Sequence, residues 1–176
     1  MSDSPAAASA VGFAVLTVSD TRTEATDTSG GLLAERIKAA GHRLVHKQIL
    51  PDDRYRIRAI VSNWIVDPAV QVVVSTGGTG LTGRDVMVEA VRPLFDKEIE
   101  GFGEVFRWLS FEEIRTSTVQ SRAIGGVANG TYIFCLPGST GACRLGWDAI
   151  LTHQFDATHR PCNMIEILPR LRERSG

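Results

Sequence analysis

The sequence repeats one pattern four times: a short apolar, β-branched segment, then a turn rich in Gly, Pro or Asp, then a segment with helical periodicity. Strands are expected at 12–18, 43–50, 70–75 and 131–136. The helices that follow them are expected at 30–40, 54–66, 84–95 and 140–151. A chain that alternates strands and helices in this way is largely restricted to the α/β folds.

The alternation predicts an α/β fold of three layers, Rossmann-like, in which a mainly parallel sheet carries helices on both faces. Right-handed crossovers then place the strand-to-helix loops at one edge of the sheet, where open α/β sheets bind ligands. A length of 176 residues suits one hydrophobic core. We expect a single domain over 11–170, a disordered N-terminal tail over 1–10 and a C-terminal tail over 171–176.

Charge and cysteine usage exclude several classes of protein. A formal net charge of −1 gives no broad positive field for nucleic acid or an anionic membrane. No apolar segment approaches the roughly 20 residues that span a bilayer, and the first residues lack the pattern of a signal peptide. Cys135, Cys143 and Cys162 form neither a disulfide framework nor a zinc motif. These features predict a soluble, cytoplasmic protein.

The strongest local signal is the glycine-rich loop Thr76-Gly77-Gly78-Thr79-Gly80, which follows the third predicted strand. Clustered glycines allow positive φ angles and close backbone approach, so backbone N–H groups can surround phosphate oxygens. A tight turn alone would explain one or two of these glycines. A Walker A loop requires Lys followed by Ser or Thr, and no such pair follows a glycine in the chain. The loop therefore predicts a phosphate-binding site outside the Walker A class.

A dinucleotide site is a weaker alternative for the same loop. Gly78, Gly80 and Gly83 match the GxGxxG pattern. The acidic residue of that fingerprint should close a second strand about 20 residues later. Here that distance reaches 101–103, where the sequence predicts a helix and no intervening strand. The spacing thus disfavours NAD binding.

Asp52 and Asp85 each lie between a predicted strand and a predicted helix. Taken singly, each suits helix capping: Asp52 is a good N-cap, and Thr82-x-x-Asp85 resembles a capping box. Taken together, they place two carboxylates at the loop-bearing edge of the sheet. Mg²⁺ prefers oxygen ligands and commonly takes one or two from protein. The pair therefore predicts a magnesium site beside the phosphate loop.

Further polar residues belong to the same edge. Ser19 and Asp20 end the first predicted strand, with Asp27 and Ser29 nearby in the following loop. Four arginines can offer a bidentate fork to phosphate, although any single surface arginine is commonly only solvated: Arg22, Arg84, Arg122 and Arg144. Arg122 and Ser121 lie in a long excursion, 96–130, that must fold over the edge to reach it. That excursion contains a predicted helix with Phe102, Val105, Phe106 and Leu109 on one face.

These residues resemble the MoaB/MogA family of molybdenum cofactor biosynthesis proteins. The resemblance extends from about residue 13 to 168, and five segments carry it: Leu16-Thr-Val-Ser-Asp20, Ser75-Thr-Gly-Gly-Thr-Gly80 with Arg84-Asp85, Glu100-Gly-Phe-Gly-Glu104, Gln120-Ser-Arg122 and Leu136-Pro-Gly-Ser139. The MoaB branch is the more similar one, judging by Leu109-Ser-Phe-Glu-Glu-Ile114, Pro137-Gly-Ser-Thr140 and Arg160-Pro-Cys-Asn163.

The resemblance implies a molybdopterin-binding type of α/β domain that forms trimers, or hexamers of two trimers. It implies adenylylation of molybdopterin with ATP as co-substrate and Mg²⁺ as cofactor. On this chain the essential, metal-holding carboxylates correspond to Asp52 and Asp85, and the nucleotide-binding loop to 76–80. The molybdate-inserting enzyme is a further partner that the resemblance implies. In this chain the substrate-contacting residues are expected to be Ser19, Asp20, Ser121, Arg122 and Ser139.

Two features bear on whether the chain is active. Some MoaB-branch proteins have other residues in place of the two aspartates, whereas this chain keeps Asp52 and Asp85 and is therefore expected to be active. Active relatives usually have a second proline after the Pro-Gly pair, where this chain has Ser139-Thr140. The alternative is a catalytically silent protein that holds or delivers the pterin. The molybdate-inserting relative needs additional domains that 176 residues do not supply.

Overall fold

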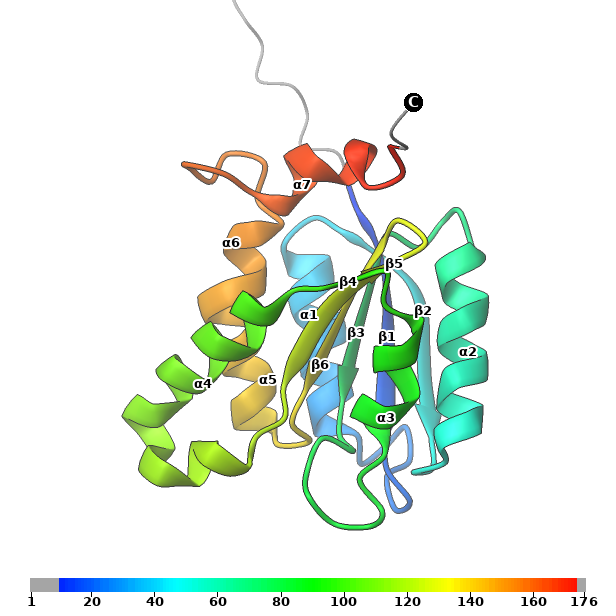
Figure 1. Ribbon diagram of the computed structural model, residues 1–176, viewed down its shortest axis with the longest axis vertical. Helices are drawn as coiled ribbons and strands as arrows, with labels where there is room; N and C mark the ends of the chain where they lie inside the picture. The colour runs from blue at the N-terminus through cyan, green and yellow to red at the C-terminus, as the bar shows by residue number, and fades with distance from the viewer. Residues whose placement is uncertain (1–9, 174–176) are drawn as a thin grey trace, which may run out of the picture.

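A computed structural model describes residues 10–173, in which six strands form one sheet of order β2-β1-β3-β6-β5-β4 (Figure 1). The strands are β1 (Gly12–Val18), β2 (Arg43–Leu50), β3 (Val72–Thr76), β4 (Lys97–Glu98), β5 (Ile124–Ala128) and β6 (Thr131–Leu136). The main helices are α1 (Thr28–Ala39), α2 (Arg54–Val66), α3 (Met87–Val91), α4 (Glu100–Ile114), α5 (Thr140–Gly146), α6 (Thr152–Gln154) and α7 (Met164–Ile167). The 3-10 segments η1 (Arg92–Leu94), η2 (Arg115–Gln120) and η4 (Leu168–Arg170), and the π-helical segment η3 (Trp147–Leu151), complete the structure. Of the predicted tails, 1–9 and 174–176 lie outside the described residues.

The sheet is mixed but mainly parallel, as predicted. β1 pairs with β2 and β3, and β3 pairs with β6, all in parallel. β5 is antiparallel to both β6 and β4. The four parallel strands are the four strands expected from the sequence, and their carboxyl ends lie at the lower edge of the sheet in Figure 1.

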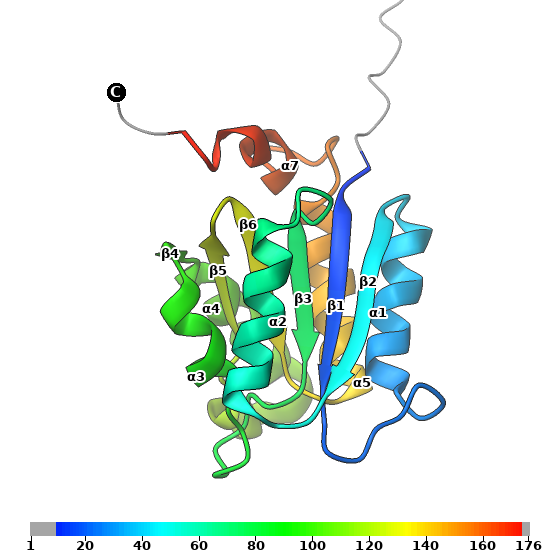
Figure 2. The same ribbon diagram turned by 90° about the vertical axis from the view of Figure 1, so that its right-hand side faces the viewer.

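Alternate residues of the central strands build two separate cores, one on each face of the sheet. Figure 2 shows helices on both faces. Phe13, Val15 and Val74 face α1, α4, α5 and η3, where Phe102 and Phe106 of α4 and Trp147 of η3 are buried. Ala14, Leu16 and Val73 face α2 and α3. Both faces of β1, β3 and β6 are fully covered, which explains why these strands are continuous apolar segments. The predicted three-layer α/β fold is thus confirmed.

The predicted helix over 84–95 is wrong at its start. The structure begins α3 only at Met87 and continues it as the 3-10 segment η1, which contains Pro93. The preceding residues form a turn, because the N–H of Asp85 donates to the carbonyl of Thr82 and the N–H of Met87 donates to the carbonyl of Gly78. These bonds take the backbone out of the helical path.

The excursion over 96–130 folds as a helix with two strands that the sequence analysis did not predict. Phe102 and Phe106 of α4 are buried as expected, but Val105 is 40% exposed. β4 has only two residues, so no periodicity could indicate it. β5 contains Gly125 and Gly126, which weaken any strand signal. A Cβ atom at Gly126 would overlap the ring of Phe95, so close packing explains that glycine.

No helix of the described residues 10–173 is long and apolar enough to cross a membrane.

Candidate active site

A cleft of about 510 Å³ opens at the carboxyl ends of the parallel strands. The loops after β1, β2, β3 and β6 line it on one side, and α4 with η2 lines it on the other. The topology therefore brings most of the predicted site residues together. Those that line the cleft are Ser19, Arg22, Asp27, Ser29, Asp52, Thr76, Gly77, Gly78, Thr79, Gly80, Arg84, Asp85, Ser121 and Ser139.

The glycine-rich loop forms the floor of the cleft. Gly77 and Gly78 have φ angles of 96° and 67°, in the left-handed region that favours glycine. The N–H of Gly77 is not free, because it donates a 3.0 Å hydrogen bond to the carbonyl of Leu136 and extends the pairing of β3 with β6. Within residues 10–173, no protein acceptor pairs with the N–H groups of Gly78 and Thr79. These two are the available backbone donors of the loop.

Asp52 does not cap α2, contrary to the capping alternative. The N-cap is its neighbour Asp53, whose Oδ1 accepts hydrogen bonds from the N–H groups of Tyr55 and Arg56 at 2.9 and 3.0 Å. The Asp52 carboxylate instead lies beside Gly78, where a Cβ atom would come within 3.1 Å of its Oδ1. Helix capping therefore does not account for Asp52.

Asp85 also lies outside a helix N-terminus, since Val86 is the N-cap residue of α3. Its Oδ2 accepts hydrogen bonds from the N–H and the hydroxyl of Thr82, at 2.9 and 2.6 Å. This is the predicted Thr82–Asp85 contact, but it closes a loop instead of starting a helix. A Cβ atom at Gly80 would lie 2.7 Å from the same Oδ2. The absence of a side chain at position 80 is what admits this carboxylate.

The two carboxylates differ in their protonation energetics. Burial raises the pKa of Asp52, and the nearby charges of Asp20 and Asp85 raise it further, against a lowering by Arg84. Burial also acts to raise the pKa of Asp85, but hydrogen bonds from Thr82 and from the N–H of Gly80 outweigh it, so its pKa lies below the usual value. Negative charge thus accumulates at one side of the cleft.

This arrangement suits a divalent cation. Within residues 10–173 no cluster of three or more acidic, His or Cys side chains is placed to hold a metal ion alone. Mg²⁺, however, commonly uses one or two carboxylates and takes its other oxygens from phosphate and water. A cation between Asp52 and Asp85 would offset the repulsion that raises the pKa of Asp52. The donor set therefore fits magnesium together with a phosphate-bearing substrate.

Asp20 lies at the rim of the cleft, outside its lining, and its carboxylate is already occupied. Its Oδ2 accepts two hydrogen bonds from the guanidinium of Arg84, one of them 3.0 Å long, and its Oδ1 accepts one of 3.1 Å from the N–H of Asp52. These bonds hold the pKa of Asp20 below its usual value, with the bond from Arg84 the largest cause. In this geometry Asp20 joins three loops and does not face the cleft.

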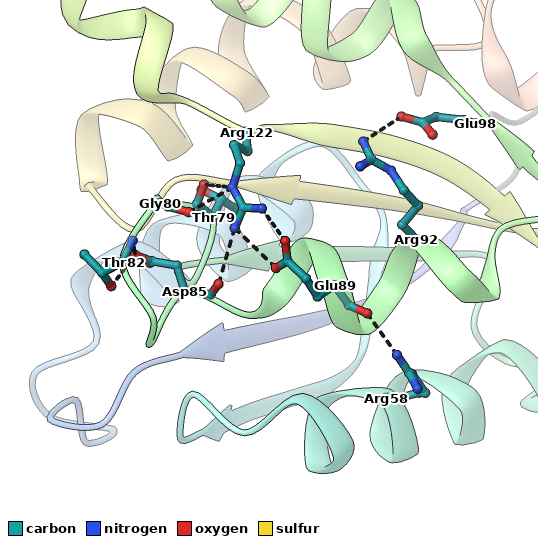
Figure 3. A network of polar contacts seen from close by, with 9 residues as sticks. All are labelled: Arg58, Thr79, Gly80, Thr82, Asp85, Glu89, Arg92, Glu98 and Arg122. Carbon is teal, nitrogen blue, oxygen red and sulfur yellow. Dashed lines mark hydrogen bonds and ion pairs between the residues drawn. The ribbon is translucent and has the colours of Figure 1, made fainter.

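Arg122, predicted to contact substrate, is also absent from the cleft lining. Its guanidinium lies behind the glycine-rich loop, on the carbonyl oxygens of that loop and on Glu89 of α3 (Figure 3). Part of the excursion, α4 with η2, lines the cleft. Ser121, which follows η2, lies in the cleft, whereas Arg122 lies on the outer side of the glycine-rich loop.

Two helix starts close the cleft beside β6. Ser139 is the N-cap of α5, and its Oγ accepts a 3.1 Å hydrogen bond from the N–H of Ala142. Asp27 is the N-cap of α1 and is buried, with hydrogen bonds from Thr17 and from the N–H of Gly30. Ser29 donates to the carbonyl of Gly138 at 2.8 Å, which links the two helix starts. Asp27 therefore has a structural role, which is to cap α1 and to accept the hydrogen bond of Thr17.

Sequence reasoning did not identify the wall contributed by α4 and η2. Phe106, Ser110 and Ile114 line the cleft opposite the glycine-rich loop. The helical spacing of these residues, four apart, was a signal that could have indicated a common face. Nothing else in the sequence shows that the C-terminal half of this helix faces a cleft.

Comparison with known proteins identifies the family. Residues 14–157 match the family described as "Probable molybdopterin binding domain". The chain is 60% identical over 151 residues to Molybdenum cofactor biosynthesis protein B of Escherichia coli strain K12, a match that covers 86% of this chain and 89% of that protein. The segments that suggested the family all lie in or next to the matched region.

Solved structures agree with the sequence comparison. A crystal structure of Molybdenum cofactor biosynthesis protein B superposes with a TM-score of 0.86 at 41% identity, covering 96% of this chain and all of that chain. The tungsten cofactor synthesizing protein MoaB from Pyrococcus furiosus gives a TM-score of 0.78 at 37% identity, covering 95% of this chain and 100% of that one. The chain therefore belongs to the MoaB/MogA family of molybdenum cofactor biosynthesis proteins.

Proposed function

We propose that this protein adenylylates molybdopterin, with Mg-ATP as the second substrate and pyrophosphate as the second product. The observation that carries the proposal is the position of two carboxylates against one glycine-rich loop: Asp52 beside Gly78 and Asp85 beside Gly80. A pterin carrier has no need of this pair. An enzyme that brings two phosphate groups together needs charge neutralisation there.

In the proposed reaction, an oxygen of the terminal phosphate of molybdopterin attacks the α-phosphorus of ATP. The bond from the α-phosphorus to the bridging oxygen breaks, and pyrophosphate leaves with that electron pair. The N–H groups of Gly78 and Thr79 bind phosphate oxygens, and Asp52 with Asp85 holds Mg²⁺. Mg²⁺, when bound, neutralises phosphate charge as it builds up on the leaving group.

No protein nucleophile takes part in this scheme. Of the three cysteines, Cys143 is the one beneath the loop, and its thiol donates to Oγ1 of Thr76 at 3.1 Å. Burial raises the pKa of Cys143 to about 11, and that of Cys135 to about 12, so both thiols stay protonated at neutral pH. Direct transfer of the adenylyl group between two bound substrates is consistent with this chemistry.

The wall opposite the loop gives the substrate its second contact surface. Phe106 and Ile114 offer apolar surface, and Ser110, Ser117 and Ser121 offer hydroxyl groups. A flat, polar heterocycle such as a pterin needs both kinds of contact. We assign the pterin to this wall and the phosphates to the floor, with Ser19 and Ser139 as additional hydroxyl groups at the edge.

The decisive experiment is incubation of the protein with molybdopterin, ATP and Mg²⁺, followed by chromatographic detection of adenylylated pterin. We expect product from the wild type and at least a 10²-fold lower rate, about the scale of losing a transition-state charge partner, for Asp85→Ala. Pterin binding without product in the wild type would overturn the proposal in favour of a carrier.

We also propose that the protein is a homo-oligomer that assembles through the outer face of α4. Four large apolar side chains along α4 are exposed: Val105, Trp108, Phe111 and Ile114, at 40%, 69%, 42% and 49%. The same helix buries Phe102 and Phe106 on its inner face, so it is apolar on both sides. Exposed apolar surface of this extent is typical of an interaction site. Ile114 also lines the cleft, which places the proposed interface next to the site.

A further inference from the structure

We propose that Arg122 is a positioning residue that holds Asp85 in place from two sides, in place of the substrate contact predicted from the sequence. The inference rests on the proposed function, in which Asp85 holds Mg²⁺. It comes from the contacts of one guanidinium with the outer side of the glycine-rich loop (Figure 3).

The guanidinium reaches three carbonyl oxygens, two in the glycine-rich loop and one at Asp85, farther along the chain. Nε donates to the carbonyl of Gly80 at 2.8 Å and to that of Thr79 at 3.3 Å. Nη2 donates to the carbonyl of Asp85 at 3.3 Å. The loop residues from 77 to 86 belong to no helix or strand, so these bonds act on backbone that regular structure does not hold.

The planarity of the peptide unit turns these contacts into a constraint on Asp85. The carbonyl of Thr79 and the N–H of Gly80 belong to one rigid plane and point in opposite directions. With the carbonyl held by Arg122, the N–H of Gly80 is directed to the carboxylate of Asp85, which lies against position 80 and whose pKa this N–H lowers. Arg122 also holds the carbonyl of Asp85 itself. The side chain and the main chain of Asp85 are thereby fixed by the same guanidinium.

Glu89 anchors the guanidinium on the far side. Its Oε1 pairs with Nη1 of Arg122, and its Oε2 accepts from Nη2 at 3.3 Å. The carbonyl of Glu89 in turn accepts a 2.9 Å hydrogen bond from Arg58 of α2. The Arg122 guanidinium is therefore linked through Glu89 to α3 and α2, two helices that pack on the sheet.

The same contacts argue against a direct phosphate ligand. All three guanidinium nitrogens are engaged, and the charge is balanced by Glu89. An arginine that bound phosphate would have to break these bonds, and Arg122 does not line the cleft. Lysine cannot replace Arg122, because one ammonium group cannot match the planar guanidinium, which donates to several oxygens at once.

The test measures amide hydrogen exchange over residues 77–86 in the wild type, Arg122→Gln and Arg122→Lys. We expect exchange in this segment to become at least about tenfold faster in both variants, since several charge-assisted hydrogen bonds are lost. Glu89→Gln should give a smaller acceleration. The matched control is Arg92→Gln, which breaks the neighbouring Arg92–Glu98 pair, 3.1 Å long, and touches no residue of the loop.

A second readout separates positioning from substrate binding. In both Arg122 variants the Mg²⁺ concentration for half-maximal adenylylation should rise at least about tenfold, with the KM for molybdopterin within about twofold of the wild type. Unchanged exchange over 77–86 in Arg122→Gln would overturn the proposal. So would a raised KM for molybdopterin that Arg122→Lys restores. Hydrogen exchange requires no turnover, so a wild type without product defeats the proposed function and leaves this test intact.

Discussion

The backbone N–H of Asp52 donates a 3.1 Å hydrogen bond to Oδ1 of Asp20, 32 residues earlier in the chain. Oδ2 of the same carboxylate accepts hydrogen bonds from Arg84. One side chain therefore joins the loops that follow β1, β2 and β3. This junction explains why Asp20 matters to the site although it does not line the cleft, and why the charge on Asp52 depends on its neighbours.

Asp52→Asn and Asp85→Asn should change stability in opposite directions. The pKa of Asp52 is raised in the folded protein, so its ionisation opposes folding once the pH exceeds the usual pKa of aspartate. The pKa of Asp85 is lowered, so its ionised form adds stability that is lost as the pH falls through the lowered pKa. We expect changes of less than about 1 kcal/mol each at pH 7, because solvent screens partly exposed groups.

Urea unfolding at pH 7 measures both free energies, with Asp52→Asn more stable than the wild type and Asp85→Asn less stable. The two variants control each other, since both replace a carboxylate with an amide in the same cleft. A change of the same sign in the free energy of unfolding of both variants would contradict the opposite pKa shifts of Asp52 and Asp85.

Gly80→Ala should impair the reaction through Asp85. The added Cβ atom would lie 2.7 Å from Oδ2 of Asp85 and must displace that carboxylate. We expect adenylylation to fall by about 10²-fold, the scale of a 1 Å misplacement of a reacting group. Gly83→Ala is the matched control, because nothing lies within 4 Å of a Cβ atom there and the residue has no positive φ. Equal rates for the two variants would contradict the role of this contact.

Magnesium dependence should vary with pH, because protons compete with the metal for Asp52. With the pKa of Asp52 raised by burial and by the charge of Asp20, protonation begins at a higher pH than for an ordinary aspartate. We expect the half-maximal Mg²⁺ concentration to increase as the pH is lowered.

Asp20→Asn removes one of the charges that repel the Asp52 carboxylate, so the rise in the half-maximal Mg²⁺ concentration should occur at lower pH. Arg84→Gln removes the opposing positive charge, so the same rise should occur at higher pH. Steady-state rates at several Mg²⁺ concentrations and pH values measure both shifts. A pH dependence that neither substitution moves would show that another group titrates.

Trp108→Glu should dissociate the protein if the outer face of α4 is the oligomer interface. Trp108 is 69% exposed in the single chain, and a carboxylate buried without a partner in an interface is strongly unfavourable. Sedimentation velocity should show an oligomer for the wild type and a smaller species for the variant. Tyr55→Glu is the control, since Tyr55 is 72% exposed on α2 and lies outside the proposed interface. An unchanged assembly in Trp108→Glu would place the interface elsewhere.

Local patterns in the sequence determined the fold class and the location of the site. The apolar segments at β1, β3 and β6 and the turns after them are properties of adjacent residues, and parallel topology then requires that their loops meet. This reasoning placed Asp52, Asp85 and the loop over 76–80 at one sheet edge, and the structure brings them to one cleft. Strands β4 and β5 were not predicted. β4 has only two residues, and the glycine pair in β5 obscures its apolar pattern.

Only the tertiary structure decided what each polar side chain does. Whether Asp52 or Asp53 caps α2 depends on where the backbone enters the helix, and that follows from packing. Arg122 is 33 residues from Glu89 and 42 from Gly80, so no local pattern could show that it contacts the back of the loop. Sequence periodicity reports which face of an element is buried. The partner of a single hydrogen bond depends on distances of a few tenths of an ångström between distant segments, which only the assembled fold sets.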